Sequence, residues 1–210
     1  MAQVANARSR RVKRWIDVAV AAAGLAILSP IMGITALAIR WRMGRPILFR
    51  QDRPGYRGKP FNLIKFRTLR EASDKGDAPV PESDLSTRLG QFLRRTSLDE
   101  LPQLWNILKG EMSLVGPRPL VMEYLIHYTP TQARRHEVPP GLTGWAQVNG
   151  RHDVNWEERF AYDVWYVDNW SLLLDLRIIV LTVRKVFSGA ASTPPAVSDF
   201  GFTRPDDVSL

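Results

Sequence analysis

The stretch VAVAAAGLAILSPIMGITALAI, residues 18–39, decides the fold of this chain because it contains no charged residue. As a helix rising about 1.5 Å per residue it would be roughly 33 Å long, enough to cross a hydrocarbon core of about 30 Å. Ser29 and Pro30 interrupt it near the middle. Proline has no N–H for the carbonyl of Ala26 and disfavours helical geometry in the residue before it, whereas a serine hydroxyl can satisfy a freed carbonyl. The sequence therefore predicts an apolar membrane segment with a helix break at Ser29 and Pro30.

Both flanks of this segment are basic and aromatic. Basic residues prefer the cytoplasmic side of a membrane, so two basic flanks indicate that both ends lie on that side. The halves, residues 18–28 and 31–39, would each reach about 14–16 Å, which is half of the hydrocarbon core. We therefore expect a re-entrant hairpin over residues 15–42; a kinked full span and a buried soluble helix are the alternatives. A cleaved signal peptide is disfavoured because basic residues follow directly and no A-x-A site precedes them. The flanking residues are Arg8, Arg10, Arg11, Lys13, Arg14 and Trp15 on one side and Arg40, Trp41, Arg42 and Arg45 on the other.

The charge of the 210-residue chain is concentrated at its N-terminal end. The net charge is +8, from 29 Lys and Arg against 21 Asp and Glu. Residues 1–59 hold 12 basic and 2 acidic residues, whereas the remainder holds 17 and 19. A nucleic-acid-binding protein usually spreads its basic residues over the folded surface, so a basic block beside an apolar segment indicates membrane lipid and no nucleic acid as the partner. The absence of cysteine excludes disulfides, thiolate zinc sites and thiol nucleophiles.

The chain beyond residue 42 alternates short strands with helices. Period-two patterns and turn residues predict strands at residues 47–51, 61–68, 112–115 and 145–148. Apolar residues at helical spacing predict helices within residues 85–95, 97–110, 120–137, 156–167 and 172–187. Residues 71–84 are polar and contain prolines, which predicts a mobile loop. The fold class is therefore α+β, mainly helical with a few short strands, and includes amphipathic helices at the membrane interface.

Asp99 and Glu100 are adjacent carboxylates at the start of the predicted helix SLDELPQLWNILKG. Two neighbouring anions raise each other's proton affinity, and a helix N-terminus or a divalent cation offsets the repulsion. Mg²⁺ prefers carboxylate oxygens together with substrate phosphates. Ser97 and Glu100 match a capping box, but that start places Pro102 where its missing N–H matters, and a later start removes the conflict. By position alone, the pair is either an ordinary helix start or part of a site for phosphate chemistry.

Several basic residues are candidates for binding phosphate. Arg118 is the strongest of them, because it lies in the sequence GPRP, in which two prolines restrict the backbone. The others, taken one at a time, are equally well explained as solvated surface residues. The chain has no Walker A loop, no G-x-G-x-x-G, no H-E-x-x-H and no G-x-S-x-G. The candidates are Lys65, Arg67, Arg94, Arg95, Arg118 and Arg151.

Five segments follow one another in this order: KRWIDVAVAAAGLAILSPIM, FNLIKFRTLR, FLRRTSLDELPQLWNILKGEMSLVGPRP, GLTGWAQVNGR and WEERFAYDVWYVDNWSLLLDLRI. Together they resemble the bacterial sugar transferase family, the monotopic polyprenol-phosphate phosphoglycosyl transferases. The resemblance extends over residues 13–187, and residues 92–119 are its most specific part. The chain looks like the small form of the family, essentially the catalytic unit alone.

The resemblance implies a set of site residues. Asp99 matches the nucleophile and Glu100 its dyad partner, and the family requires Mg²⁺, which is expected to bind Asp99. Ser29 and Pro30 match the break of the re-entrant helix. Asp175 matches a further acidic position whose role the sequence does not reveal. The basic positions around the phosphate site correspond to Lys65, Arg94, Arg118 and Arg151.

The resemblance also implies a reaction and an organisation. A phosphosugar would pass from a UDP-sugar, through an aspartyl intermediate, to a polyprenol phosphate such as undecaprenyl phosphate, at the cytoplasmic face of the bacterial inner membrane. This would be the first membrane step of glycan assembly; a homodimer and contacts with downstream glycosyltransferases are further expectations. The alternative function is a non-catalytic membrane scaffold for glycan enzymes. The expected parts are a basic segment (1–14), the membrane hairpin (15–42), a catalytic domain (43–188) and a disordered tail (189–210).

Overall fold

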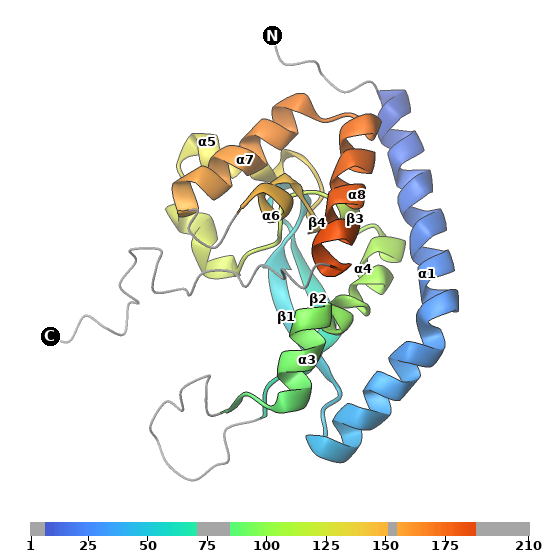
Figure 1. Ribbon diagram of the computed structural model, residues 1–210. Coiled ribbons are helices and arrows are strands. Elements are labelled where there is room, and N and C mark those ends of the chain that lie inside the picture. The colour runs from blue at the N-terminus through green and yellow to red at the C-terminus, as the bar shows by residue number, and fades with distance from the viewer. Residues whose placement is uncertain (1–6, 71–84, 151–154, 188–210) are drawn as a thin grey trace, which may run out of the picture.

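The computed structural model describes residues 7–70, 85–150 and 155–187 (Figure 1). The expected mobile loop at 71–84, Arg151 and the tail from residue 189 all lie outside the described residues. Within them, helices predominate and two separate two-stranded sheets occur. The predicted α+β class, mainly helical with a few short strands, is confirmed.

The apolar segment belongs to α1 (Ala7–Arg42), a continuous helix of 36 residues with Pro30 inside it. We expected two half-helices; the structure has one helix that bends in the lower part of Figure 1. The hydroxyl of Ser29 donates a hydrogen bond of 2.8 Å to the carbonyl of Ala26, the acceptor that Pro30 cannot serve. This substitute bond explains why the proline bends the helix without ending it. Among the described residues, α1 is the one helix long and apolar enough to cross a membrane.

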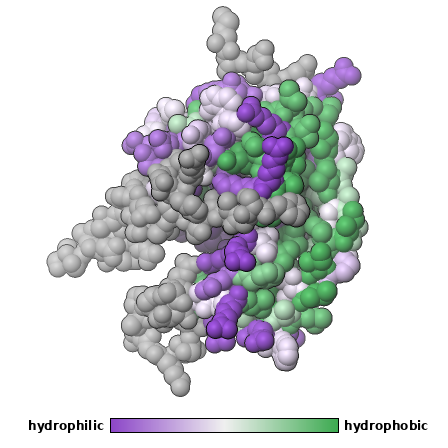
Figure 2. Space-filling model, in the orientation of Figure 1, coloured by the Kyte–Doolittle hydropathy of each residue, from purple (hydrophilic) through white to green (hydrophobic). Residues whose placement is uncertain are grey.

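One side of α1 packs against the rest of the protein and the other side is exposed. Ala21 lies in a core cluster with Phe61 and Leu104, and Ile39 in a second cluster with Phe66. The exposed side carries large apolar residues, and Figure 2 shows hydrophobic side chains gathered along this edge of the molecule. Those at least two-thirds exposed are Trp15, Ile27, Ile34, Leu37 and Trp41.

The predicted strands after α1 form a hairpin. β1 (Leu48–Pro54) pairs with β2 (Pro60–Phe66) in an antiparallel register that places Leu48 opposite Phe66, and η1 (Tyr56–Gly58) connects them. Phe61 and Leu63 are buried beneath α4 (Gln103–Lys109), and the period of two places Lys65 on the same face. The hairpin thus carries a lysine to the sheet face that α4 covers.

The second sheet consists of β3 (Ser113–Val115) and β4 (Gly141–Thr143), which are parallel. The strand predicted at 112–115 is confirmed, but the one predicted at 145–148 is wrong, because those residues begin the helix α6 (Trp145–Asn149). Pairing occurs at the glycines instead: a Cβ on Gly141 would lie 2.1 Å from the backbone nitrogen of Gly116. Only glycine permits the two backbones to come this close. The strand β4 therefore forms at a glycine, where the sequence has no alternation of apolar and polar residues to predict it.

Most predicted helices are confirmed. They are α3 (Arg88–Thr96), α4, α7 (Trp156–Asn169) and α8 (Leu172–Phe187). The helix predicted over residues 120–137 is instead three short pieces, η3 (Met122–His127), α5 (Pro130–Ala133) and η4 (Arg134–Glu137). Thr129 is extended and caps α5, and Pro130 follows it without an N–H to donate, so no single helix can run through this point.

The helix α8 is amphipathic, as expected. Leu174 and Ile178 are buried against Val115 and Tyr166 in a third core cluster. Its opposite side exposes Leu173, Leu176, Val180 and Val183, which recur at helical spacing. In Figure 1, α8 stands next to the upper part of α1.

Candidate active site

Asp99 and Glu100 lie in a tight turn between two helices. α3 ends at Thr96, its C-cap residue Ser97 adopts a left-handed conformation with φ of 56°, and the turn η2 (Leu98–Glu100) follows. The capping box is wrong, because the side chain of Ser97 makes no capping hydrogen bond. Pro102 occupies the residue before α4, where its missing N–H costs no helical hydrogen bond. The acidic pair therefore precedes α4 and does not lie in its first turn.

Asp99 is the buried member of the pair, with 7% of its surface exposed. Burial raises the pKa of Asp99 to about 6, and the negative charge of Glu100 adds to the rise. The positive charges of Lys65 and Arg118 act in the opposite direction. At neutral pH Asp99 is therefore mostly ionised but poorly solvated, which is a favourable state for a carboxylate nucleophile.

Glu100 is paired with Arg118 from the loop that follows β3. Nη2 of Arg118 lies 2.7 Å from Oε1 of Glu100, and the Arg118 side chain remains 42% exposed. The Glu100 carboxylate raises the pKa of Arg118. The ion pair orients Glu100 beside Asp99 and leaves part of the guanidinium accessible to a ligand.

Two further predicted cations reach this site from separate elements. Lys65 comes from β2, where burial lowers its pKa and the nearby charges of Arg94 and Arg118 lower it further, while Asp99 opposes this effect. Arg94 comes from the last turn of α3, and its Nε donates to Oγ1 of Thr68 at 3.0 Å. The structure thus brings Lys65 and Arg118 to the acidic pair and places Arg94 near Lys65.

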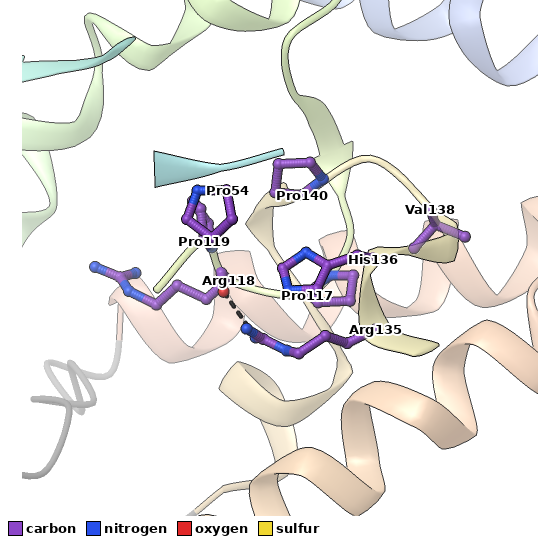
Figure 3. A pocket seen from close by; sticks show the side chains of 8 residues that line it. All are labelled: Pro54, Pro117, Arg118, Pro119, Arg135, His136, Val138 and Pro140. Carbon is purple, nitrogen blue, oxygen red and sulfur yellow. Dashed lines mark hydrogen bonds between the residues drawn. The ribbon is translucent and has the colours of Figure 1, made fainter. Parts of the chain in front are cut away.

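The loop of residues 116–119 is held by its backbone. The N–H of Gly116 donates to the carbonyl of Thr143 at 2.8 Å, and the N–H of Gly141 donates to the carbonyl of Pro117 at 2.9 Å. A small pocket lies against this loop and is lined by Arg118 and the neighbouring prolines, and Figure 3 shows the guanidinium of Arg118 pointing away from those prolines. These backbone hydrogen bonds, together with the prolines, restrict the backbone from which the Arg118 side chain extends.

The arrangement has ligands suited to one magnesium ion that is shared with a substrate. Mg²⁺ is usually bound by one or two carboxylates, with water and substrate phosphates filling the remaining positions. The described residues contain no group of three or more His, Cys, Asp or Glu that could hold a metal by themselves. Because Arg118 engages Glu100, Asp99 is the carboxylate that could bind such an ion.

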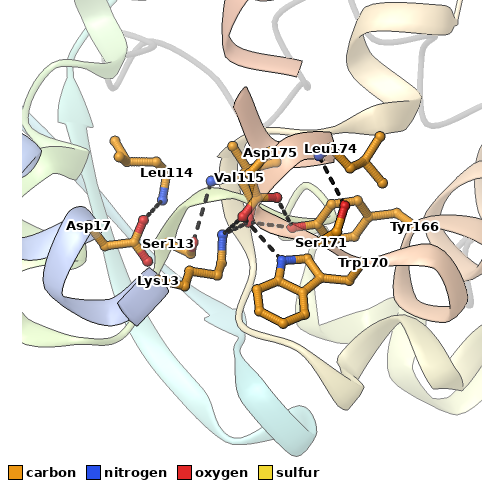
Figure 4. A network of polar contacts seen from close by, with 10 residues as sticks. All are labelled: Lys13, Asp17, Ser113, Leu114, Val115, Tyr166, Trp170, Ser171, Leu174 and Asp175. Carbon is orange, nitrogen blue, oxygen red and sulfur yellow. Dashed lines mark hydrogen bonds and ion pairs between the residues drawn. The ribbon is translucent and has the colours of Figure 1, made fainter. Parts of the chain in front are cut away.

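Asp175 does not join this site. It is buried and accepts hydrogen bonds from Lys13 at 2.6 Å, Tyr166 at 2.6 Å and Trp170 at 3.1 Å (Figure 4). Lys13 also donates to the carbonyl of Val115, which lies 3.1 Å from the hydroxyl oxygen of Tyr166. Asp175 therefore ties the start of α1 to β3, α7 and α8, and its surroundings assign it a structural role.

The remaining basic candidates also differ in their placement. Arg67 is buried and donates to the carbonyls of Arg45 and Met43, so it fastens the connection between α1 and β1. Arg95 is exposed on α3.

Sequence reasoning missed Asn106, which is fully buried in α4. Its side chain accepts from the N–H of Ile64 at 3.1 Å and donates to the carbonyl of Asn62 at 2.8 Å and to Glu111 at 2.7 Å. These bonds fasten α4 to the strand that carries Lys65. The available signal was a polar residue within the apolar run from Leu104 to Leu108.

Comparison with known proteins assigns the chain to a family. The pattern of the bacterial sugar transferase family matches residues 8–189. An uncharacterized sugar transferase of Bacillus subtilis (strain 168) is 50% identical over 200 residues, which cover 94% of this chain and 98% of that protein.

Several relatives carry the functional name UDP-glucose:undecaprenyl-phosphate glucose-1-phosphate transferase, among them proteins from Escherichia coli and Caulobacter vibrioides. The one from Escherichia coli (strain K12) is 40% identical over 194 residues, or 88% of this chain and 42% of the relative. The one from Caulobacter vibrioides is 42% identical over 186 residues, or 84% of this chain and 70% of the relative. This chain thus spans less than half of the first and about two-thirds of the second. It belongs to the bacterial sugar transferase family.

Proposed function

We propose that this chain transfers a phosphosugar from a UDP-sugar to a polyprenol phosphate. Relatives from Escherichia coli and Caulobacter vibrioides are named for a reaction of this kind. The observation that carries the proposal is the buried carboxylate of Asp99, whose pKa is about 6, with Lys65 and Arg118 beside it and Arg94 near Lys65. A carboxylate nucleophile among cations suits attack on a phosphoryl group.

The proposed reaction has two displacement steps at one phosphorus atom. In the first, a carboxylate oxygen of Asp99 attacks the phosphorus that bears the sugar, the bond to UMP breaks, and UMP leaves with the electron pair. In the second, a phosphate oxygen of the polyprenol phosphate attacks this phosphorus and the bond to Asp99 breaks. The products are a polyprenyl-diphosphate-linked sugar and the regenerated carboxylate. Covalent catalysis of this kind divides one difficult transfer into two easier ones.

The charged residues have distinct roles in this proposal. Lys65, Arg94 and Arg118 neutralise negative charge on the phosphoryl oxygens. Glu100 holds Arg118 at the site through their 2.7 Å ion pair. Mg²⁺ bound at Asp99 would supply further charge neutralisation. Arg151 is proposed as an additional phosphate-binding residue on the basis of the family resemblance.

The membrane helix suits a lipid-linked acceptor. We propose that α1 enters the inner membrane from the cytoplasm, bends at Ser29 and Pro30, and leaves on the same face. The exposed apolar side of α1 and the basic residues at both of its ends support this placement. The exposed apolar stripe of α8 would then lie at the lipid interface. One substrate would arrive from the cytosol, and the other would present its phosphate at the bilayer surface.

The covalent step can be tested without the acceptor. The detergent-solubilised protein is incubated with Mg²⁺ and each member of a UDP-sugar panel, and its intact mass is measured while UMP release is quantified. We expect one UDP-sugar to add the mass of a phosphosugar and to release UMP in an amount that matches the protein. Asp99→Asn should show neither change, whereas Asp52→Asn, an exposed carboxylate on β1, should behave as wild type.

Two results would contradict this proposal. UMP release that requires polyprenol phosphate, with no adduct under any trapping condition, would indicate a single displacement from a ternary complex. Glycan assembly that continues at full rate in cells carrying Asp99→Asn would favour the non-catalytic scaffold.

A further inference from the structure

A buried ion pair joins η4 to α7. Nη2 and Nε of Arg135 lie 2.7 Å and 3.0 Å from Oδ2 of Asp163, and the two side chains are only 2% and 5% exposed. Nη1 of Arg135 donates to the hydroxyl of Tyr128 at 3.1 Å, and its guanidinium lies 5.5 Å from the ring centre of Phe160. Apolar residues of similar volume are often at least as stabilising as a buried ion pair. Stability alone therefore does not explain why two charges lie here.

The same guanidinium makes one more contact, and that contact reaches the active site. Nη2 of Arg135 donates to the backbone carbonyl of Arg118 at 2.8 Å, the bond drawn as a dashed line in Figure 3. The side chain of Arg118 is bound at its far end by Glu100, at 2.7 Å. Arg118 is thus held at two points, its carbonyl by Arg135 and its guanidinium by Glu100.

We propose that Arg135, oriented by Asp163, is a positioning residue that fixes Arg118 for phosphosugar transfer. The inference rests on the proposed function, because it assigns Arg118 a role at the reacting phosphate. A fixed backbone lets the arginine meet the developing charge without reorganising, and a displacement of about 1 Å can reduce a rate up to 100-fold. The effect should therefore fall mainly on kcat, with little change in KM for the UDP-sugar.

The neighbouring residue offers a matched control. Arg134 also pairs with α7, through Nη2 and Oδ1 of Asp168 at 2.5 Å, but these side chains are 36% and 35% exposed. The two arginines are adjacent in η4 and bind the same helix. Arg135 is buried and contacts the carbonyl of Arg118, whereas Arg134 is partly exposed and pairs with Asp168 and Glu137. Arg134 therefore serves as the control for losing an arginine that pairs with α7 from η4.

The test measures kcat and KM of full-length variants in detergent micelles. Arg135→Lys retains the charge that Asp163 needs but lacks the planar pair of donors. The double variant Arg135→Met with Asp163→Leu removes both charges together, so neither is left buried alone. We expect both to lower kcat by about 10- to 100-fold with KM within about threefold, and Arg134→Lys to stay within about twofold of wild type. Thermal unfolding and gel filtration identify the variants that are folded.

A double-mutant cycle separates positioning from a general structural effect. If Arg135 acts through Arg118, the Arg135→Lys change should cost little further activity in an Arg118→Ala background. The proposal would be overturned if the activity losses of Arg135→Lys and Arg118→Ala multiplied in the combined variant. It would also be overturned if the folded variant with Arg135→Met and Asp163→Leu had the wild-type kcat. Failure of the wild-type protein to form any phosphosugar adduct would refute the proposed function instead, so the two failures are distinguishable.

Discussion

At the scale of single residues, Asp99 is a carboxyl group whose burial opposes its own ionisation. Its pKa rises from 3.8 to about 6, so the folded protein binds the proton more tightly than the unfolded chain does. The resulting penalty is absent below about pH 4 and complete above about pH 6, where it reaches at most about 3 kcal/mol. Asp99→Asn should therefore stabilise the fold by about 1–3 kcal/mol at pH 8, and by almost nothing at pH 4. Urea unfolding in micelles measures this change in stability, and Asp52→Asn, at an exposed aspartate, is the control. An equal effect of Asp99→Asn at both pH values would contradict the prediction.

Lys65 should set the pH at which Asp99 becomes active. Its positive charge lowers the pKa of Asp99, so its removal raises that pKa above about 6. In wild type, the rate of UMP release in the first turnover should fall about tenfold per pH unit below this pKa. In Lys65→Met this decline should begin at higher pH. Lys59 is an exposed lysine in the hairpin turn, and in the control Lys59→Met the decline should begin at the same pH as in wild type. Identical pH profiles for wild type and Lys65→Met would show that Lys65 does not act on the nucleophile.

At the scale of elements, Pro30 should determine the path of α1. Alanine at this position restores the N–H that bonds the carbonyl of Ala26, so the helix should straighten and favour a full span. The chain has no cysteine, so single cysteines placed near both ends of α1 report which face each end occupies. We expect labelling from one face in wild type and from both faces in Pro30→Ala. Gly33→Ala is the control, because its new Cβ meets no atom within 4 Å.

The elements show which sequence signals suffice and which do not. Long periodic patterns predicted α7, α8 and the β1–β2 hairpin, because side chains on one face must be buried together. Periodicity failed between residues 120 and 149, where proline and close glycine contacts decide the structure. Thr129 and Pro130 start a new helix there, and Gly141 pairs with the loop at Gly116. These outcomes depend on what the segment meets in space, which a local pattern does not contain.

At the scale of the whole molecule, Asp175 should stabilise the contact between α1 and the rest of the protein. Its removal leaves Lys13 partly buried without its partner and deprives Tyr166 of an acceptor. We expect Asp175→Ala to lower the free energy of unfolding by about 3–5 kcal/mol. Glu137→Gln, which removes an exposed partner of Arg134, should cost less than about 1 kcal/mol. Chemical unfolding of the solubilised proteins gives both free energies. Similar losses of stability in the two variants would show that the contacts of Asp175 do not stabilise the protein more than an exposed ion pair does.

The candidate site was predictable in part, from the family resemblance and not from periodicity. The resemblance pointed to Asp99, Glu100 and the cations, and the structure brings Lys65 and Arg118 to the acidic pair and Arg94 to Lys65 from three separate segments. It also marked Asp175, whose contacts with Lys13 and Tyr166 are structural. A family pattern records that a residue matters but not whether it meets a substrate or another part of the chain.

The sidedness of α1 has a consequence for how the protein sits in a bilayer. From Ala21 to Ile39, one side of the helix is occupied by side chains of the folded domain, so lipid can surround only the other side. A bilayer that accepts α1 must therefore also accommodate the flank of the domain attached to it. The depth of α1 in the bilayer is then set by its attachment to the domain and not by a match between helix length and bilayer thickness. In vesicles of thin and of thick lipids, Asp99 should therefore lie at the same height relative to the headgroups.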